Sequence, residues 1–245
     1  KQTSYVSHEG RYDLSVTVEQ TRPVFRLKLP VAIWTLGSPV GKIYNIQLEA
    51  GVQDYHFQLS SKPVAVRLDP YNDVMRRLDV GEAPASLSQT YGAQSVTAVL
   101  PENDELGYRK FAQSVAKQEN ILTGRTEYPE GSLWVFGRSF LLPEDFMDEL
   151  RKSGIEVGEK GIKFPEKMVP WKNHSFVFTL NRPDHKKGTL TWVVTDTKES
   201  IPGLMRKLPH YGKYGYLVFE GSMPDNRSKG LWSSKPVGLQ KIFME

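Results

Sequence analysis

The spacing of apolar residues changes partway along the 245-residue chain, and this change limits the possible folds more than any other feature. From Tyr12 to Leu68, apolar and polar residues alternate in short runs such as YDLSVTVEQ and DYHFQLS. After about residue 95, compact apolar runs such as SVTAVLP alternate with segments of helical spacing such as NDELGYRKFAQSVAKQ. Period-two alternation is typical of half-buried antiparallel strands, whereas strands that alternate with helices favour an α/β layered domain. The sequence therefore predicts two domains of different class.

The first region is predicted to be a small β-sandwich of immunoglobulin-like architecture. Leu14, Val16 and Val18 would share one face of a strand, and Phe25, Leu27 and Leu29 one face of another. Five or more such strands in about seventy residues, separated by Gly, Pro and Ser, fit that architecture. The chain has no cysteine, so this sandwich has to rely on its apolar core.

The second region is predicted to be an α/β layered domain with a mainly parallel sheet. The segment beginning at Asp73 reads as a short helix, and Gly81 marks the domain boundary. We assign residues 1–80 to the sandwich, 81–94 to a linker and 95–245 to the α/β domain. Its expected strands are SVTAVLP, GSLWVFG, HSFVFTLNRP, TLTWVVTD and YGYLVFEG, and its expected helices are NDELGYRKFAQSVAKQ, LPEDFMDELRKSG and SIPGLMRKLPHYGKY.

Charge and apolar content restrict the partners of the chain. No run of eighteen apolar residues occurs and the first ten residues lack the order of a signal peptide, so we expect no membrane segment. Residues 182–245 contain eleven Lys or Arg against six Asp or Glu. These basic residues are scattered rather than clustered, so nucleic acid is not the expected partner. Because the first residue is Lys, we expect the chain to be part of a longer protein.

No complete catalytic or metal-binding motif is present. The closest match to the zinc motif H-E-x-x-H is HEGRY, but Tyr12 replaces its second histidine and the segment leads into a strand rather than a helix. The absence of cysteine excludes thiolate ligands and nucleophiles, and G-x-S-x-G is also absent. Glu102, Asp104 and Glu105 follow the first α/β strand, where they would repel a phosphate. We therefore predict no catalytic residue, no metal site and no cofactor in this chain.

Two segments are candidates for binding. Gly137, Arg138 and Ser139 follow an expected strand, and open α/β sheets bind ligands at the carboxyl ends of their strands. An ordinary connection is the alternative interpretation of this loop.

The segment LPHYGKYGYLVFEG is the second candidate. A helix end and a strand account for most of it, but His210, Tyr211, Lys213 and Tyr214 exceed what a turn requires. Aromatic residues beside a charge often mark interfaces, so these four, with Trp232, form a candidate interaction surface. Simple packing is the alternative.

Two long stretches carry a resemblance to a known family. Residues 62–93, KPVAVRLDPYNDVMRRLDVGEAPASLSQTYGA, and residues 201–232, IPGLMRKLPHYGKYGYLVFEGSMPDNRSKGLW, resemble the C-terminal region of bacterial M1-family (gluzincin) zinc metallopeptidases. Neither H-E-x-x-H nor the exopeptidase signature G-x-M-E-N of that family occurs here, so no catalytic residue is carried over.

The resemblance implies a non-catalytic fragment downstream of a peptidase domain: a sandwich of the kind that follows M1 catalytic domains, plus an α/β module. Zinc would then be held only by the catalytic domain of the same parent chain, which would be the main partner. This region would support or cover that domain. A module that binds a peptide or a small molecule is the alternative function, and a hydrolase whose residues converge only in the fold is a third.

Overall fold

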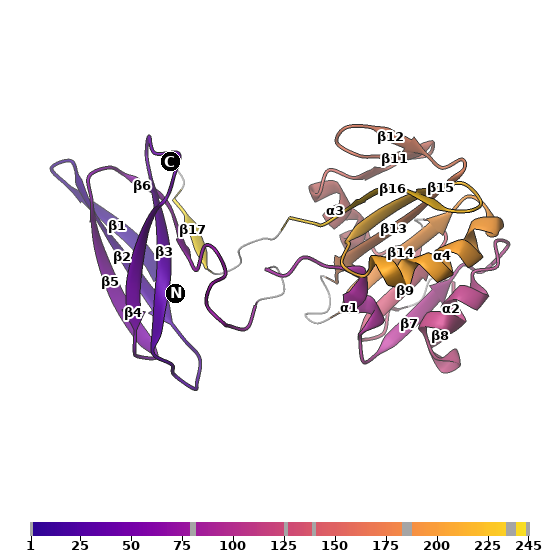
Figure 1. Cartoon of the computed structure of the whole chain (residues 1–245), viewed down its shortest axis with the longest axis horizontal. Coiled ribbons are helices and arrows are strands. Elements are labelled where there is room, and N and C mark those ends of the chain that lie inside the picture. Colours follow the sequence, from indigo (N-terminus) through magenta and orange to yellow (C-terminus); the bar gives the residue numbers. More distant parts are fainter. Residues whose placement is uncertain are drawn as a thin grey trace. The chain divides into compact units, whose positions relative to one another are not determined.

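The computed structural model describes residues 2–78, 82–124, 127–138, 141–182, 188–233 and 239–243. The chain divides into two compact units (Figure 1): unit 1 is Lys1–Glu82 with Lys235–Glu245, and unit 2 is Ala83–Ser234. Unit 1 has one apolar core, and unit 2 has one core on each face of its main sheet. None of the helices in the described ranges is long and apolar enough to cross a membrane.

Unit 1 is built from two antiparallel sheets that share one core. Its strands are β1 (Gln2–His8), β2 (Arg11–Glu19), β3 (Leu27–Thr35), β4 (Lys42–Leu48), β5 (Val52–Leu59), β6 (Pro63–Leu68) and β17 (Gln240–Ile242). The strand order is β1-β2-β5 in one sheet and β17-β6-β3-β4 in the other. Leu14, Val16 and Val18 of β2 pack in this core with Leu29 and Val31 of β3. The period-two pattern of the sequence thus places every second residue inside.

The HEGRY segment forms a hairpin. Glu9 and Gly10 connect β1 to β2, and both have positive φ, 47° and 78°. His8 pairs directly with Arg11 across this two-residue turn. Positive φ at both central positions is typical of the tight turns that join antiparallel strands. The expectation that this segment leads into a strand rather than a helix is confirmed.

Strand β17 corrects the predicted domain limits, which had assigned residues 95–245 to the α/β domain. Lys241 lies opposite Val66 of β6 in an antiparallel pair. The Phe243 amide donates to the Val64 carbonyl at 2.9 Å, which extends the pairing beyond the strand. Because β17 has only three residues, it shows no alternation of its own, and only its distant partner defines it as a strand. Unit 2 is therefore an insertion between β6 and β17 of unit 1.

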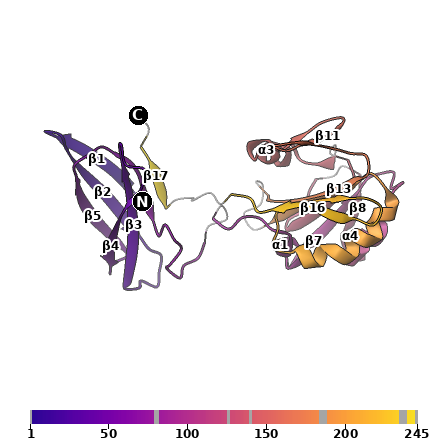
Figure 2. The ribbon, with the colours of Figure 1, turned by 45° about the horizontal axis from the view of Figure 1, so that its top comes forward.

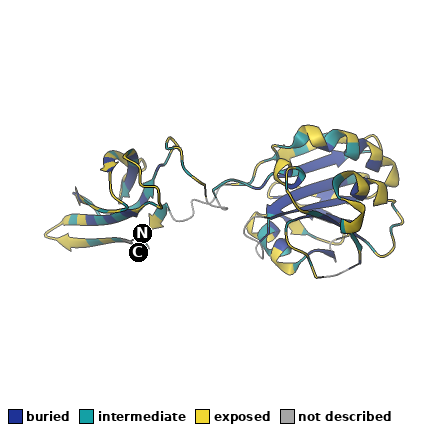
Figure 3. Ribbon diagram, turned by 90° about the horizontal axis from the view of Figure 1, so that it is seen from below, coloured by how far each residue is buried: buried dark blue, intermediate teal, exposed yellow. Residues whose placement is uncertain are grey.

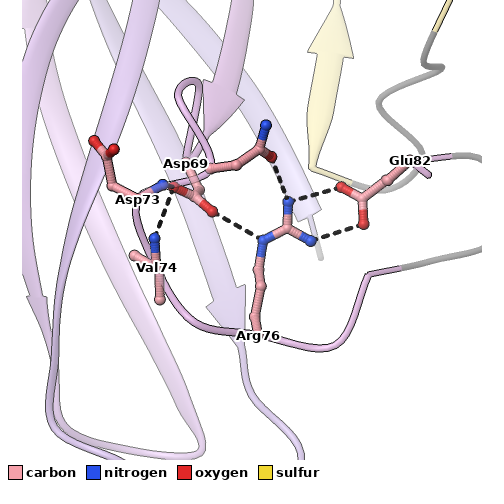
Figure 4. A network of polar contacts seen from close by, with 6 residues as sticks. Asp69, Asp73, Val74, Arg76 and Glu82 are labelled. Carbon is pink, nitrogen blue, oxygen red and sulfur yellow. Dashed lines mark hydrogen bonds and ion pairs between the residues drawn. The ribbon is translucent and has the colours of Figure 1, made fainter. Parts of the chain in front are cut away.

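The segment that follows β6 is held by a buried polar network (Figure 4). Arg76 Nε donates to Asp69 Oδ2 at 3.0 Å, and its two terminal nitrogens donate to the Glu82 carboxylate at 2.7 and 2.9 Å. Asp69 also accepts hydrogen bonds from the amides of Asp73 and Val74. Residues 73–78 are not helical, so the short helix expected from Asp73 onward does not form. Gly81 lies outside the described residues.

Unit 2 contains a seven-stranded sheet and a small three-stranded one. Its helical elements are α1 (Leu87–Tyr91), α2 (Arg109–Val115), η1 (Gln118–Asn120), α3 (Glu144–Lys152), η3 (Lys198–Ser200), α4 (Ile201–Lys207) and η4 (Leu208–Tyr211). Its strands are β7 (Val96–Leu100), β8 (Ile121–Thr123), β9 (Ser132–Phe136), β10 (Glu156–Val157), β11 (Gly161–Lys163), β12 (Met168–Pro170), β13 (His174–Asn181), β14 (Thr189–Thr195), β15 (Tyr216–Glu220) and β16 (Asp225–Gly230).

The large sheet is mixed rather than mainly parallel, which corrects the prediction. Its order is β16-β15-β13-β14-β9-β7-β8. Strands β8, β7, β9 and β14 run parallel, whereas β13, β15 and β16 join through antiparallel pairs. A parallel pair needs a crossover of a dozen or more residues. The connections from β13 to β14 and from β15 to β16 are too short for a crossover.

Both faces of this sheet are covered, which makes unit 2 a layered α/β fold. In Figure 2, α1 and α4 lie on one side of the sheet, and α3 and β11 lie on the other. Phe111 of α2 and Leu204 of α4 pack in one core, and Phe146 of α3 and Ile162 of β11 pack in the other. The central strands are accordingly buried along most of their length (Figure 3).

Helix α1 occupies part of the expected linker, residues 81–94, but belongs to the core of unit 2. Leu87 is completely buried in it. The hydroxyl of Thr90 lies 2.8 Å from that of Thr189 and 2.7 Å from that of Thr191, both on β14. These buried contacts attach α1 to the sheet, since hydroxyls without partners would be costly there.

Candidate functional site

The chain leaves β7 and β9 in opposite directions. β7 leads through α2 to β8 at one edge of the sheet, and β9 leads through α3 towards β13 on the other side. The two helices also lie on opposite faces, because Phe111 of α2 and Phe146 of α3 belong to different cores. In open α/β sheets, such a reversal between neighbouring strands is where ligands bind, at the carboxyl ends. We call this edge the switch point, formed by the residues that follow β7 and β9.

Gly137, the first predicted site residue, shapes the end of β9. Its φ is +97°, a conformation that favours glycine. Its amide donates to the Val193 carbonyl at 2.9 Å, and its carbonyl accepts from Trp192 Nε1 at 2.7 Å. A Cβ at this position would lie 3.5 Å from the ring of Pro101, which follows β7. The backbone is thus fixed on both sides at the point where the chain turns towards Arg138.

Arg138 is exposed at this edge and lies over an aromatic ring. Its guanidinium carbon is 5.1 Å from the centroid of the Trp171 ring, within the range of a cation–π contact. Trp171 is held in turn by a 3.0 Å hydrogen bond from its Nε1 to the Gly158 carbonyl and by edge contacts with Phe176 and Trp192. The Arg138 carbonyl accepts from the Leu141 amide at 3.3 Å, but its guanidinium forms no hydrogen bond or ion pair with another described residue.

A buried tyrosine lies on the α2 side of the same edge. The hydroxyl of Tyr108 accepts a hydrogen bond from the Thr195 amide at 2.9 Å. Burial raises the pKa of Tyr108; the bond from Thr195 lowers it, the charge of Asp104 raises it, and the charge of Arg138 lowers it. Both charges therefore act within electrostatic range of this hydroxyl. Asp104 also accepts from the amides of Tyr108 and Arg109, at the start of α2.

The three predicted residues of this loop have different outcomes. Gly137 and Arg138 lie at the switch point, whereas Ser139 lies outside the described residues. Sequence reasoning missed Trp171, which completes the site. No spacing or motif connects positions 138 and 171, because only the fold brings them together.

The second candidate surface is only partly assembled. The rings of Tyr211 and Tyr214 lie 6.0 Å apart, and Lys213 Nζ is 5.2 Å from the Tyr214 centroid. The structure adds Lys229 of β16, whose Nζ lies 5.5 and 5.3 Å from the two tyrosine centroids. We call Tyr211, Lys213, Tyr214 and Lys229 the lysine–tyrosine surface. His210 is exposed beside it in η4.

Trp232 does not belong to that surface. Its Nε1 donates to the Thr179 carbonyl, and its ring lies 5.3 Å from that of Tyr216. These contacts place it against the core of the α3 face, whereas Tyr211 and Tyr214 pack on the α4 face. Tyr211 and Tyr214 therefore lie on one side of the sheet, and Trp232 lies on the other.

No described histidine has both a serine and a carboxylate as hydrogen-bond partners. His174 Nδ1 makes its hydrogen bond with the Lys172 carbonyl, at 2.9 Å. A serine–histidine contact occurs on the exposed side of unit 1, where Ser15 Oγ lies 3.0 Å from His56 Nδ1. The nearby carboxylate of Asp54 instead accepts from Thr17. No group of three or more His, Asp or Glu suited to a metal ion occurs among the described residues.

None of the protein-family models matches this chain, and no curated protein sequence matches it. The class of this protein is described by its fold and its candidate site. Two antiparallel sheets around one core carry an inserted mixed α/β unit, and this unit has an arginine–tryptophan pair at the ends of its parallel strands.

Proposed function

We propose that this chain is the accessory C-terminal region of an M1-like zinc metallopeptidase, which supports or covers the catalytic domain without holding the zinc. The catalytic domain of the same parent chain is then its partner, and zinc belongs to that domain. The single observation that carries this proposal is the resemblance of residues 62–93 and 201–232 to that family.

The strand order of unit 1 supports an immunoglobulin-like assignment, which is the kind of sandwich that the resemblance implies. In such sandwiches, strands A, B and E share one sheet and strands C, F and G the other. Naming β1, β2 and β5 as A, B and E, and β3, β6 and β17 as C, F and G, reproduces that division. Strand β4 then extends the second sheet beside β3.

The residues that carry the resemblance have structural roles, which fits an accessory region. Asp69, Arg76 and Glu82 hold the segment after β6 together, and the Asp69 amide attaches it to β3 by donating to the Pro30 carbonyl at 2.8 Å. Thr90 attaches α1 to β14. Gly203 allows Pro224 to approach, since a Cβ there would stand 2.5 Å from the proline ring. In each case the side chain, or its absence, maintains packing.

The lysine–tyrosine surface is the proposed contact with the partner. Lys213 and Lys229 are exposed, and neither forms an ion pair with another described residue. Ammonium groups held over tyrosine rings combine charge with a large apolar area, as interface residues often do. The surface therefore suits an acidic patch on the catalytic domain.

Calorimetric titration of this chain with the catalytic domain from the same reading frame tests the proposal. We expect binding, with no peptide hydrolysis and no stoichiometric zinc in this chain alone. The double change Lys213→Glu/Lys229→Glu is expected to weaken binding about tenfold, because it makes both charges repulsive. The matched control is Lys160→Glu/Lys167→Glu, at exposed positions near β11. An upstream frame without H-E-x-x-H, or zinc-dependent hydrolysis by this chain, would refute the accessory role.

A second candidate function is a ligand-binding module at the switch point of unit 2. The observation that favours it is Arg138, which lies at the predicted edge of the sheet over Trp171 and whose guanidinium has no polar partner among the described residues. An exposed arginine held by an aromatic ring is available to a ligand. Ligand-induced shifts of the Gly137 and Trp171 amide signals in a nuclear magnetic resonance spectrum test this function.

A further inference from the structure

The guanidinium of Arg138 is both positioned and available. Its contact with Trp171 uses the face of that ring, and Trp171 is fixed by its hydrogen bond to Gly158. A guanidinium over an aromatic ring keeps its N–H groups for other acceptors, and its fork matches a carboxylate or a phosphate. Because the platform is already ordered, less conformational entropy is lost when Arg138 binds an anion.

The charges around the switch point favour an anion of low charge. Glu102 and Asp104 follow β7, and Glu102 is exposed. The Glu102 side chain lies near the end of β8, because a Cβ on Gly124 would stand 3.0 Å from its Oε1. Two carboxylates outnumber the one arginine, so they oppose an anion in proportion to its charge, and a carboxylate monoanion is disfavoured less than a phosphate dianion.

The apolar surface beside Arg138 indicates the body of the ligand. Trp171 is half-buried and packs against the core of the α3 face, so part of its ring remains open to solvent. Ligand sites commonly combine an aromatic wall with a few polar groups that fix orientation.

We infer that Arg138 and Trp171 form a subsite for the carboxylate of a small organic acid with an apolar body. This inference rests on the second proposed function, ligand binding at the switch point. Arg138 holds the carboxylate, and the indole of Trp171 contacts the apolar part.

Three probes of similar size or charge test the inference on the full chain labelled with ¹⁵N. Phenylacetate carries the carboxylate, phenylacetamide is its neutral counterpart, and inorganic phosphate is the competing anion. We expect phenylacetate to shift the Gly137 amide and the Trp171 indole N–H signals with a dissociation constant of about 1 mM, as suits so small a ligand. Phenylacetamide and phosphate should bind at least about tenfold more weakly.

Variants at exposed positions make the outcome specific. Arg138→Ala is expected to weaken phenylacetate binding at least about tenfold, and Arg138→Lys by a smaller factor, since lysine keeps the charge but loses the fork. Lys167→Ala, a change of charge elsewhere on the surface, should leave binding within about twofold.

The possible failures are distinguishable. Equal binding of phosphate and phenylacetate would overturn the assignment to carboxylates. Equal binding of phenylacetamide, unaffected by Arg138→Ala, would overturn the role of Arg138 but leave ligand binding at the switch point standing. If no probe shifts either signal, both the inference and the second proposed function fail.

Discussion

Replacing Arg76 by methionine tests whether the buried polar network holds the segment after β6. The side chain of Arg76 is 19% exposed, while those of Asp69 and Glu82 are 1% and 8% exposed. The change therefore leaves two nearly buried carboxylates without their counter-charge. Removing one partner of a fully buried pair typically costs about 3–5 kcal/mol. Because Arg76 is partly exposed, we expect unit 1 to lose about 2–4 kcal/mol of unfolding free energy.

Hydrogen exchange read by mass spectrometry measures this loss, because it reports each unit separately. Protection of β6 amides should fall roughly 30- to 1,000-fold, as 1.4 kcal/mol corresponds to a factor of ten. Amides of β14 in unit 2 should be unaffected. The matched control is Arg77→Met, at the exposed neighbouring position, whose side chain forms no hydrogen bond or ion pair with another described residue. Equal effects of Arg76→Met and Arg77→Met, within about 0.5 kcal/mol, would refute the reasoning.

A double variant identifies the cause of the loss. If the unpaired carboxylates are responsible, adding Glu82→Gln to Arg76→Met removes one buried charge and should restore about 1 kcal/mol. If the two changes instead add their costs, the network acts through packing of the arginine stem and not through charge.

Three further outcomes follow from individual contacts. Burial raises the pKa of Tyr91 from 10.0 to about 12, so its contribution to the free energy of unfolding is complete below pH 10 and is lost as the pH rises towards 12. In urea unfolding, the free energy of unfolding should therefore decrease less over this pH range in Tyr91→Phe than in the unchanged chain. Equal decreases in the two proteins would contradict this. Gly230→Ala would bring a Cβ within 2.4 Å of the Tyr216 ring and should destabilise unit 2 by about 1–3 kcal/mol. Gly158→Ala, whose Cβ would have its nearest contact at 3.6 Å, should be tolerated. Similar thermal unfolding midpoints for the two variants would refute the steric argument. Deleting residues 239–245 removes β17 and bares the edge of β6, so exchange should increase in unit 1 but not in unit 2; an unchanged β6 would show that the pairing contributes nothing.

The alternation of apolar and polar residues predicted the strands of unit 1 well. It failed where a side chain, and not a neighbouring strand, forms the hydrogen bonds of the backbone. The alternation identified Leu14, Val16 and Val18 as core residues, and they are buried. Phe25 was expected on the inner face of the next strand, yet it is exposed and precedes β3. The side-chain amide of Gln20 takes both backbone groups of Phe25, so no strand pairs there. Such a local competitor leaves no periodic signal.

Contacts between distant parts of the chain were beyond the sequence. The antiparallel half of the large sheet results from short connections between consecutive strands. These strands are as apolar as the parallel ones, so the periodicity of the sequence does not distinguish parallel from antiparallel strands. Likewise, Trp171 could not be assigned to Arg138, because the two residues meet only through the fold. By contrast, the position of Gly137 and Arg138 at a strand end was predicted, since a strand boundary is a local property.

The insertion of unit 2 explains why a short strand is sufficient to close unit 1. β17 forms few backbone bonds and is partly exposed, so on its own it would separate easily from β6. Its neighbours add to the pairing: the Leu68 amide donates to the Leu239 carbonyl, and the rings of Tyr5 and Phe243 meet edge-on at 5.2 Å. Within unit 2 the chain enters and leaves at neighbouring points, because a Cβ on Gly215 would stand 2.8 Å from the Ala85 carbonyl and 2.4 Å from the Trp232 ring. An insertion with closely spaced ends raises the effective concentration of the returning strand for β6, so the few backbone bonds of β17 are sufficient for pairing.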